Sequence, residues 1–279
     1  MAITNFQPEI WSAQLLVAFE KALVFGSLAN RNYEGEISAA GDTVRVTSIA
    51  APTIDDYVVH TDITVEDVDD SQQTLVVDQA KYFAFEVDDV EKRQALGDVM
   101  PEQTRKAGYG IADLVDQYLA DLLNTAAAGN EITDITAATA GAVYDALVDL
   151  SVKLDELNVP QEGRWAVVPP IARGNLAKDD RFVGAGTANA VKENGQIGEA
   201  AGFSVRLSNN CPTGDGTPAG ELQVIGGTSE SISFASQIVS VEAARMEKRF
   251  ADMVKGLQLY GAKCFTKGGV SPTASFGIS

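Results

Sequence analysis

Apolar residues recur at the spacing of an α-helix in three segments of the chain. These segments predict helices at residues 8–25, 101–128 and 142–157. The second is the clearest, because Pro101 suits a first helical turn and Gly129 follows its end. Its apolar stripe is formed by Ile111, Leu114, Val115, Tyr118, Leu119, Leu122 and Leu123. At about 1.5 Å per residue, this helix is expected to be roughly 40 Å long.

The first predicted helix is apolar around much of its circumference. One face carries Trp11 and Leu15, and a second apolar row that includes Phe19 lies beside it. A helix of this kind has to be buried, either in the core of its own subunit or against another subunit.

Alternating apolar and polar residues predict the strands. A longer strand or a pair of strands is expected at residues 74–87, where Phe83 and Phe85 alternate with Tyr82 and Ala84. Other predicted strands are at 41–49, 165–168, 203–208, 231–241 and 253–265. The order of these elements indicates a mixed α+β chain in which β-structure with long loops follows the helices.

A polar, acidic stretch lies between the first two predicted strands. From Asp55 to Asp70 it contains seven carboxylates and no Lys or Arg. Two β arms joined by a charged tip predict a long hairpin that projects from the body. Because an isolated hairpin is only marginally stable in water, we expect it to rest on another surface.

The net charge narrows the classes of function. The chain has 279 residues, with 39 Asp and Glu against 21 Lys and Arg, which gives a formal charge of −18. Binding to nucleic acid by counterion release needs clustered cations, and the sequence has no Lys- or Arg-rich run. A nucleic-acid-binding protein and a binder of anionic membranes are therefore disfavoured. The sequence also shows no signal peptide and no run of 18 apolar residues that would span a membrane.

The candidate chemistry is sparse. The single histidine, His60, lies in the acidic stretch and is expected to be a solvated loop residue, with a pH-sensing role as the alternative. Cys211 and Cys264 are expected to be reduced thiols, although pairing is the alternative. The acidic stretch lacks the central glycine of a calcium-binding loop, and no phosphate-binding loop is present. We therefore expect no catalytic site, cofactor or metal.

Several segments resemble, in the right order, the Hong Kong-97-type major capsid proteins of tailed bacteriophages. The hairpin start is Gly41–Val44 followed by Ala51–Tyr57, and the second arm is Asp78–Asp89. Later matching segments are Trp165–Pro170, Gly198–Pro212 and Gly256–Gly261. Each segment is weak evidence alone, but their common order is fairly specific, and the resemblance covers nearly the whole chain. The resemblance implies an α+β capsid fold and a structural protein that self-assembles into an icosahedral shell around double-stranded DNA.

The resemblance also implies a division of the chain into parts. Residues 1–35 would be an N-terminal arm and residues 36–90 an extended loop that lies across a neighbouring subunit. Residues 91–130, with a long spine helix, and the return strands of 236–279 would form a peripheral domain. Residues 131–235 would form an axial domain that gathers around five-fold and six-fold positions.

Candidate interface residues follow from the acidic tip and the apolar arm, which we expect to contact other subunits. They are Trp11, Leu15, Phe19, Pro52, Asp55, Asp56, Tyr57, Asp67 and Asp69, with Arg164, Arg173, Arg181, Arg245, Lys248 and Arg249 as docking cations. Expected partners are the chain itself in pentamers and hexamers, together with scaffolding, portal and decoration proteins. Packaged DNA is expected to be enclosed without sequence-specific binding. The expected location is the virion, after assembly in the host bacterial cytoplasm. Alternatives are an encapsulin-type compartment shell, a soluble acidic α/β enzyme, or another structural or tail protein of a phage.

Overall fold

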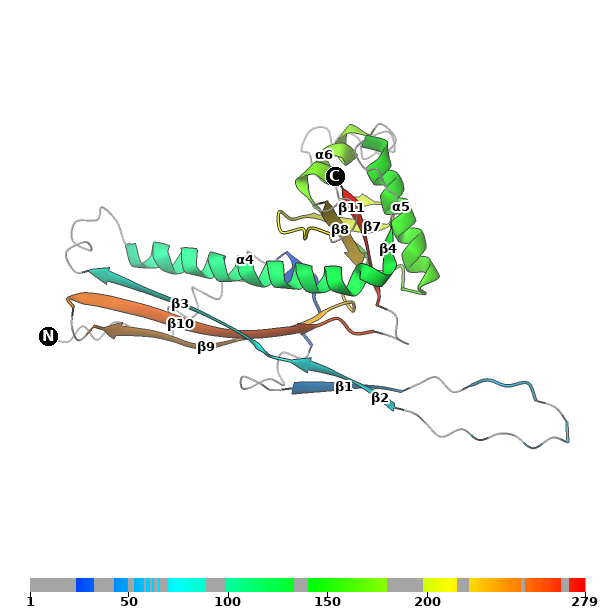
Figure 1. Ribbon diagram of the computed structural model, residues 1–279, viewed down its shortest axis with the longest axis horizontal. Helices are drawn as coiled ribbons and strands as arrows, with labels where there is room; N and C mark the ends of the chain where they lie inside the picture. The colour runs from blue at the N-terminus through cyan, green and yellow to red at the C-terminus, as the bar shows by residue number, and fades with distance from the viewer. Residues whose placement is uncertain are drawn as a thin grey trace.

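The chain forms an elongated body with a hairpin that projects from it (Figure 1). The computed structural model describes residues 24–32, 43–49, 53–57, 59–60, 62, 65, 70–88, 99–132, 140–179, 198–214, 221–246, 249–266 and 271–278. Three sheets occur among these residues, with two, three and six strands. The predicted helix at 8–25 falls almost entirely outside them.

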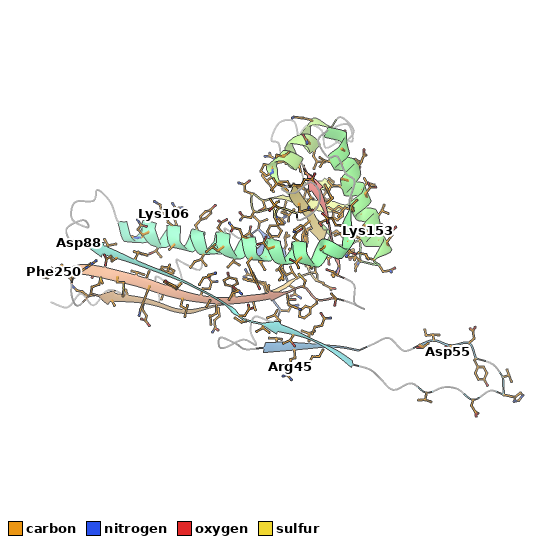
Figure 2. The ribbon with its side chains drawn as sticks, viewed as in Figure 1. Arg45, Asp55, Asp88, Lys106, Lys153 and Phe250 are labelled. Atoms are coloured by element: carbon orange, nitrogen blue, oxygen red, sulfur yellow. The ribbon has the colours of Figure 1, made fainter. Side chains whose placement is uncertain are left out.

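The projecting hairpin is confirmed. Strand β1 (Thr43–Ile49) pairs antiparallel with β2 (Asp70–Val76), so that Thr43 lies opposite Val76 and Ile49 opposite Asp70. The strands run away from the body, and Asp55 lies beyond them, far from the body (Figure 2).

The strand predicted at 74–87 is divided between two sheets. Strand β3 (Gln79–Asp88) leaves the hairpin and pairs with β10 (Ala251–Lys263), which also pairs with β9 (Ser233–Arg245). Residues 79–88 of the expected extended loop, 36–90, therefore lie in the three-stranded sheet. The physical reason is the alternation in β3, which directs Phe83, Phe85 and Val87 into a core shared with β9 and β10.

Helix α4 (Val99–Ala127) lies along one face of this three-stranded sheet and reaches the six-stranded sheet at its C-terminal end (Figure 1). Its fully or nearly fully buried positions include Ile111, Val115, Leu119 and Leu123, which recur every four residues. At about 1.5 Å per residue, its 29 residues span about 43 Å. The buried stripe is narrower than predicted, because Leu114 is exposed.

The six-stranded sheet forms a compact unit at the end of α4. Its strand order is β4-β11-β8-β5-β7-β6, in which β5 and β7 run parallel. Their bounds are β4 Glu131–Ile132, β5 Trp165–Val168, β6 Glu199–Ala200, β7 Phe203–Leu207, β8 Leu222–Gly227 and β11 Thr273–Ile278. Helices α5 (Ala140–Glu156) and α6 (Pro170–Lys178) pack on one face through Leu147, Leu150, Leu154 and Leu176.

The expected return segment, 236–279, is divided in the same way. Residues 236–245 and 251–263 lie in the three-stranded sheet, but β11 pairs with β8 and β4 in the six-stranded sheet. Every residue of β11 is buried, so this strand is buried on both faces.

Short connecting elements complete the described fold. Helix α2 (Phe25–Leu28) packs on α4, and the 3₁₀ turn η2 (Ala128–Asn130) links α4 to β4. Within the described residues, none of the helices combines the length and the hydropathy that a membrane span requires.

Candidate assembly surfaces

The hairpin tip exposes apolar side chains as well as acids. Ile54 is 95% exposed, and Tyr57, Val59 and Val65 are also largely exposed. Side chains of this size cost free energy when they stay in water, at roughly 25 cal/mol per Å² of apolar surface. The sequence pattern indicated the acids of this segment, Asp55 and Asp56 among them, more clearly than its apolar surface.

The root of the hairpin is fixed firmly to the body. The Gln73 side chain donates a hydrogen bond to the Thr266 carbonyl at 2.6 Å and accepts one from the Thr266 backbone N–H at 3.0 Å. Gly261 lets β2 pass closely over β10, because a Cβ at this position would overlap the Val76 carbonyl. The hairpin is therefore well anchored at one end and exposed at the other.

A small apolar core reinforces this root. It joins the hairpin strands to β9 and β10 through Val44, Leu75, Val77, Ala235 and Leu259. These contacts hold the direction in which the hairpin leaves the body.

The three-stranded sheet has a face that the described residues leave uncovered. This face carries Tyr82, Ala84 and Glu86 on β3, which lie opposite Leu257, Lys255 and Met253 on β10. Tyr82 lies near the middle of β3, and its side chain is 79% exposed, which is unusual for an aromatic residue at such a position. Phe250, at the turn between β9 and β10, is 80% exposed at the far end of the sheet (Figure 2). Neither aromatic residue was singled out from the sequence.

The cations of this face and its rim are paired within the subunit but remain exposed. Arg249 contacts Glu86 at 2.7 Å, Lys255 contacts Glu242 at 2.7 Å, and Arg245 contacts Asp252 at 3.3 Å. Exposed pairs of this kind are worth only about 0–1 kcal/mol each, so another carboxylate can replace the present partner at little cost.

Arg164 differs from the other predicted docking cations. Its side chain is 3% exposed and lies 2.6 Å from the Asp155 carboxylate, and it also donates hydrogen bonds to the carbonyls of Val159 and Pro160. Its hydrogen bonds hold the pKa of Asp155 below the usual value. Arg164 therefore fixes the turn between α5 and β5, and we do not retain it as a docking residue.

The described start of the chain is held by a buried carboxylate on α4. Asp116 Oδ1 accepts hydrogen bonds from the backbone N–H groups of Val24 and Phe25 at 2.9 and 2.8 Å. Asp116 Oδ2 accepts a third bond from the Asn210 side chain at 3.1 Å. Burial raises the pKa of Asp116, which opposes the effect of these donors.

Several predicted interface residues cannot be placed on any surface. Trp11, Leu15, Phe19, Pro52, Asp67, Asp69, Arg181 and Lys248 lie outside the described residues. Of the others, Asp55, Asp56 and Tyr57 lie on the exposed hairpin segment, Arg173 on α6, and Arg245 and Arg249 at the end of the three-stranded sheet.

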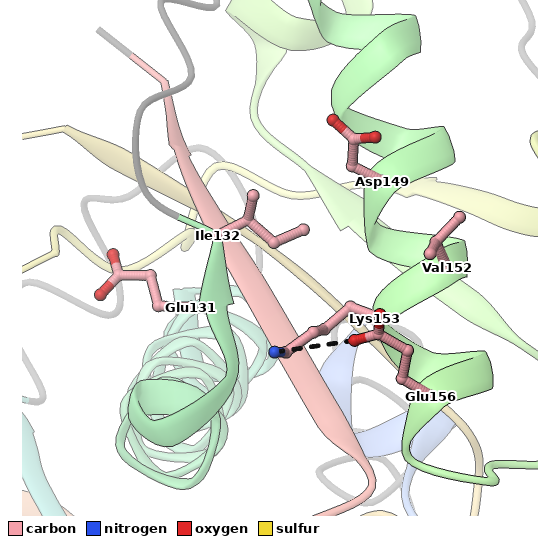
Figure 3. Close-up of a pocket in the computed structure, with 6 residues that line it drawn as sticks. All are labelled: Glu131, Ile132, Asp149, Val152, Lys153 and Glu156. Carbon is pink, nitrogen blue, oxygen red and sulfur yellow. Dashed lines mark ion pairs between the residues drawn. The ribbon is translucent and has the colours of Figure 1, made fainter.

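A shallow depression lies between β4 and α5. It has a volume of about 330 Å³ and is lined by Glu131 and Ile132 from β4 and by Asp149, Val152, Lys153 and Glu156 from α5 (Figure 3). The Lys153 ammonium lies 4.0 Å from the Glu156 carboxylate. No cluster of three or more metal-ligating side chains is found in the part of the chain that the structure describes.

The two cysteines are buried and separate. Neither Cys211 nor Cys264 is in a disulfide, and burial raises the pKa of each thiol to about 12. Thiols of this kind are poor nucleophiles, because the thiolate is the reactive form.

Comparison with known proteins assigns the fold. The family model described as phage capsid protein matches residues 69–247. The structure of Mycobacterium phage Che8 matches with a TM-score of 0.77 and 27% sequence identity, over 100% of this chain and 98% of that chain. A capsid structure of the cyanophage P-SCSP1u matches with a TM-score of 0.68 and 17% identity, over 92% of this chain and 88% of that one. No curated protein matches the sequence.

These matches confirm the α+β Hong Kong-97-type fold and the structural capsid function that the sequence predicted. The compartment-shell alternative fits less well. A virus-like particle from Pyrococcus furiosus shares the fold over 99% of this chain and 100% of that chain, but at a TM-score of 0.62 and 12% identity. With the family model matched over more than half of its length, the chain belongs to the phage capsid protein family and is the major capsid protein of a tailed bacteriophage.

Proposed function

We propose that the chain assembles as pentamers and hexamers into an icosahedral head shell that encloses double-stranded DNA. The observation that carries this proposal is the hairpin, whose root is fixed to the body while Ile54 and Tyr57 at its tip lie exposed. A segment that is held in an extended position without a core of its own is suited to contact a neighbouring molecule. Many modest contacts of this kind add up in a closed shell.

The structure supports revised boundaries for the proposed parts. The extended loop ends near Val77, where the chain enters β3. The peripheral domain combines α4 with β3, β9 and β10. The axial domain combines α5, α6 and the six-stranded sheet, including β11 from the C-terminal end of the chain.

The proposed receptor for the hairpin tip is the uncovered face of the three-stranded sheet of a neighbouring subunit. Tyr82 offers apolar area there, and Lys255 and Arg249 offer cations to the acids of the tip. Because each exposed ion pair is weak, specificity comes from the set of pairs together with burial of the apolar residues.

Charge reversal tests this contact. In a variant with Asp55, Asp56, Asp67 and Asp69 all replaced by Lys, we expect a folded subunit that forms no shells in negative-stain microscopy. The matched control reverses four exposed acids of the body, Asp78, Asp121, Glu162 and Glu230, to separate a local effect from the change in net charge. Normal shells from the tip variant would refute the docking contact.

Ionic strength gives a second test of the same proposal. A subunit with a formal charge of −18 repels its copies. The Debye length is about 8 Å at physiological salt and longer at low salt, so salt screens the long-range part of this repulsion. We expect slower assembly at about 20 mM than at about 300 mM salt by light scattering. Equal rates of assembly at the two salt concentrations would count against repulsion between subunits as a barrier to assembly.

The proposed partners extend beyond the chain itself. We infer scaffolding, portal and decoration proteins, with assembly in the cytoplasm of a bacterial host. An acidic subunit does not adhere to packaged DNA, which would then be enclosed without sequence-specific contacts. Nuclease-protected DNA in native particles would support a head shell. Enclosed protein cargo without DNA would support a compartment shell instead.

A further inference from the structure

A glycine on β11 leaves room for the side chains of the two neighbouring strands. Gly277 lies between β4 and β8 in the strand order and is paired with Gln223 of β8. A Cβ at Gly277 would overlap the Glu221 carboxylate and would lie 3.2 Å from the Gln223 amide nitrogen. Because Gly277 has no side chain, the carboxylate and the amide can both lie over the backbone of β11.

Side chains from both neighbouring strands meet over this glycine. Glu221 comes just before β8 and two residues before Gln223, which places both side chains on the same face. On the other side of β11, Glu131 of β4 accepts a hydrogen bond at its Oε1 from Gln223 Nε2, at 3.2 Å. Two carboxylates and one amide therefore converge across the middle strand.

This cluster lies on the face of the sheet away from α5. Figure 3 shows the Glu131 carboxylate on the side of β4 away from α5, whereas Ile132 points toward α5. Ile132 packs against the core beneath α5 and α6, as Val224 does, so Glu131 and Gln223 belong to the opposite face. In the part of the chain that the structure describes, no Lys or Arg forms an ion pair with Glu131 or Glu221.

The amide of Gln223 has a buried oxygen that lacks a donor. The residue is 2% exposed, and its Oε1 has no hydrogen-bond partner among the described residues. Buried polar atoms in folded proteins nearly always have a partner, because an atom that loses water without gaining one costs free energy. The Nε2 atom of the same amide already contacts Glu131, so the oxygen that lacks a partner belongs to a group aimed at the carboxylates.

We propose that Glu131, Glu221 and Gln223 form a binding site for calcium. Carboxylate and amide oxygens are typical calcium ligands, and the ion accepts about six to eight oxygens at about 2.3–2.6 Å. The three side chains supply part of this set and water supplies the rest. Magnesium fits less well, because it requires nearly octahedral geometry at about 2.0–2.1 Å.

The amide oxygen is essential to the site. The described residues contain no group of three or more His, Cys, Asp or Glu side chains that could hold a metal ion. The two carboxylates therefore need Gln223 Oε1 as a third ligand. The ion replaces the Nε2 donor beside Glu131, and the amide turns about its last side-chain bond so that its oxygen faces the ion.

The site joins three separate parts of the chain. Glu131 follows α4 and η2, Glu221 and Gln223 lie at the start of β8, and Gly277 lies near the end of β11. Glu131 and Gln223 are 92 residues apart, so the unfolded chain does not bring the ligands together. Calcium therefore binds the folded subunit in preference and stabilises it. The same separation explains why the sequence predicted no metal site.

Urea titration of unassembled subunits tests the site. With so few protein ligands, we expect a Kd of about 10⁻⁴–10⁻³ M. At about 10 mM calcium chloride, the equilibrium constant for folding should then rise by about 10- to 100-fold, relative to sodium chloride of equal ionic strength. Glu131→Gln and Glu221→Gln keep the shape of each side chain and should each cut this rise by at least about fivefold.

Two further variants sharpen the titration. Gln223→Leu removes the amide oxygen and should cut the rise as the carboxylate variants do. Glu162→Gln, at an exposed position away from the cluster, is the control and should keep the full rise. The same rise in all four variants would overturn the site and indicate general binding of calcium to an acidic subunit. A wild type without any rise would also overturn it.

Hydrogen exchange on the wild type decides the matter if a variant fails to fold. Calcium chloride should slow exchange in the peptides that contain β4, β8 and β11. Slowing confined to peptides that contain Asp55 and Asp56 of the hairpin, or no slowing at all, would overturn the site. All three ligands belong to one subunit, so these results do not depend on the proposed shell.

Discussion

The three-stranded and the six-stranded sheet differ in how far the subunit covers them. In the six-stranded sheet, β5, β8 and β11 are buried on both faces, by α5 and α6 on one side and by α4 on the other. In the three-stranded sheet, β3 alternates between partly buried and exposed residues, and Tyr82 lies in the open. The first sheet is stabilised by its own chain, whereas the second retains a surface for other molecules.

This comparison also separates two kinds of residue. Residues of the six-stranded sheet contribute to folding, and their loss is expected to appear in the free energy of unfolding of the isolated subunit. Residues on the open face are proposed to contribute to assembly, and their loss is expected to leave that free energy nearly unchanged. The following predictions test this separation, from the largest change in stability to the smallest.

The largest effect is expected from Leu150→Ala. Leu150 is fully buried on α5 and packs so closely on Gly226 of β8 that a Cβ at that glycine would overlap it. We expect a loss of about 2–5 kcal/mol in the free energy of unfolding, measured by urea titration of unassembled subunits. Val148→Ala, on the exposed side of the same helix, is the control and should cost under about 1 kcal/mol. Equal losses from the two would contradict the comparison.

Asp116→Ala is expected to have the next largest effect. It leaves the Val24 and Phe25 backbone N–H groups without their acceptor, and an unpaired buried donor costs about 1–3 kcal/mol. Hydrogen exchange should therefore become faster at these two amides, and urea titration should show the loss. Gln117→Ala, one exposed position further along α4, is the control. Unchanged protection from hydrogen exchange at both amides would show that Asp116 does not hold Val24 and Phe25 in place.

The pH dependence of stability provides a smaller and directional test. Because burial raises the pKa of Asp116, the folded subunit binds this proton more tightly than the unfolded chain. The resulting stability is present below the ordinary aspartate pKa and is lost as pH rises through the raised pKa. Relative to Asp116→Asn, the wild type should gain stability as pH falls through this window. If the difference in stability between the wild type and Asp116→Asn does not change with pH, Asp116 is not the group responsible.

The smallest change in stability is expected from Tyr82→Ser. The side chain is exposed, so unfolding of the isolated subunit should change by less than about 0.5 kcal/mol. Particle yield should nevertheless fall strongly, because the neighbour's hairpin loses apolar contact area. Thr125→Ala, at an exposed position of α4, is a control. A Tyr82→Ser variant that unfolds early would place this residue in the subunit's own core.

The sequence predicted the elements whose periodicity is strong. The spacing of apolar residues located α4 and α5 to within about two residues at each end, a usual margin, and β5 was predicted with its observed bounds. Strands β8 and β11 were missed, because a strand buried on both faces has no alternation and both contain glycine. Helix α6 was missed, although Pro170 at its start suits a first helical turn.

The assembly surfaces were harder to predict for a different reason. The acids of the hairpin tip were visible in the sequence, because charge there is a local property. Tyr82 and Phe250 were not singled out. Alternation placed Tyr82 on the face opposite Phe83 and Phe85, but only the tertiary structure shows that this face is uncovered and that Phe250 is exposed. Arg164 was misplaced for the opposite reason, because a cation is expected at the surface and this one is buried, where it pairs with the exposed Asp155.

The core around α4 has a mechanical consequence for the shell. A single apolar cluster joins α2, α4, β9 and β10 to β5 and β8, and the rings of Tyr118 and Tyr260 meet edge to face at 5.4 Å. The three-stranded and six-stranded sheets are therefore expected to move together as one rigid body. A rotation of about 5° displaces the far end of a helix about 43 Å long by about 4 Å. In the proposed shell of pentamers and hexamers, a change in curvature would then be absorbed where subunits meet, since a bend inside the subunit would break this core.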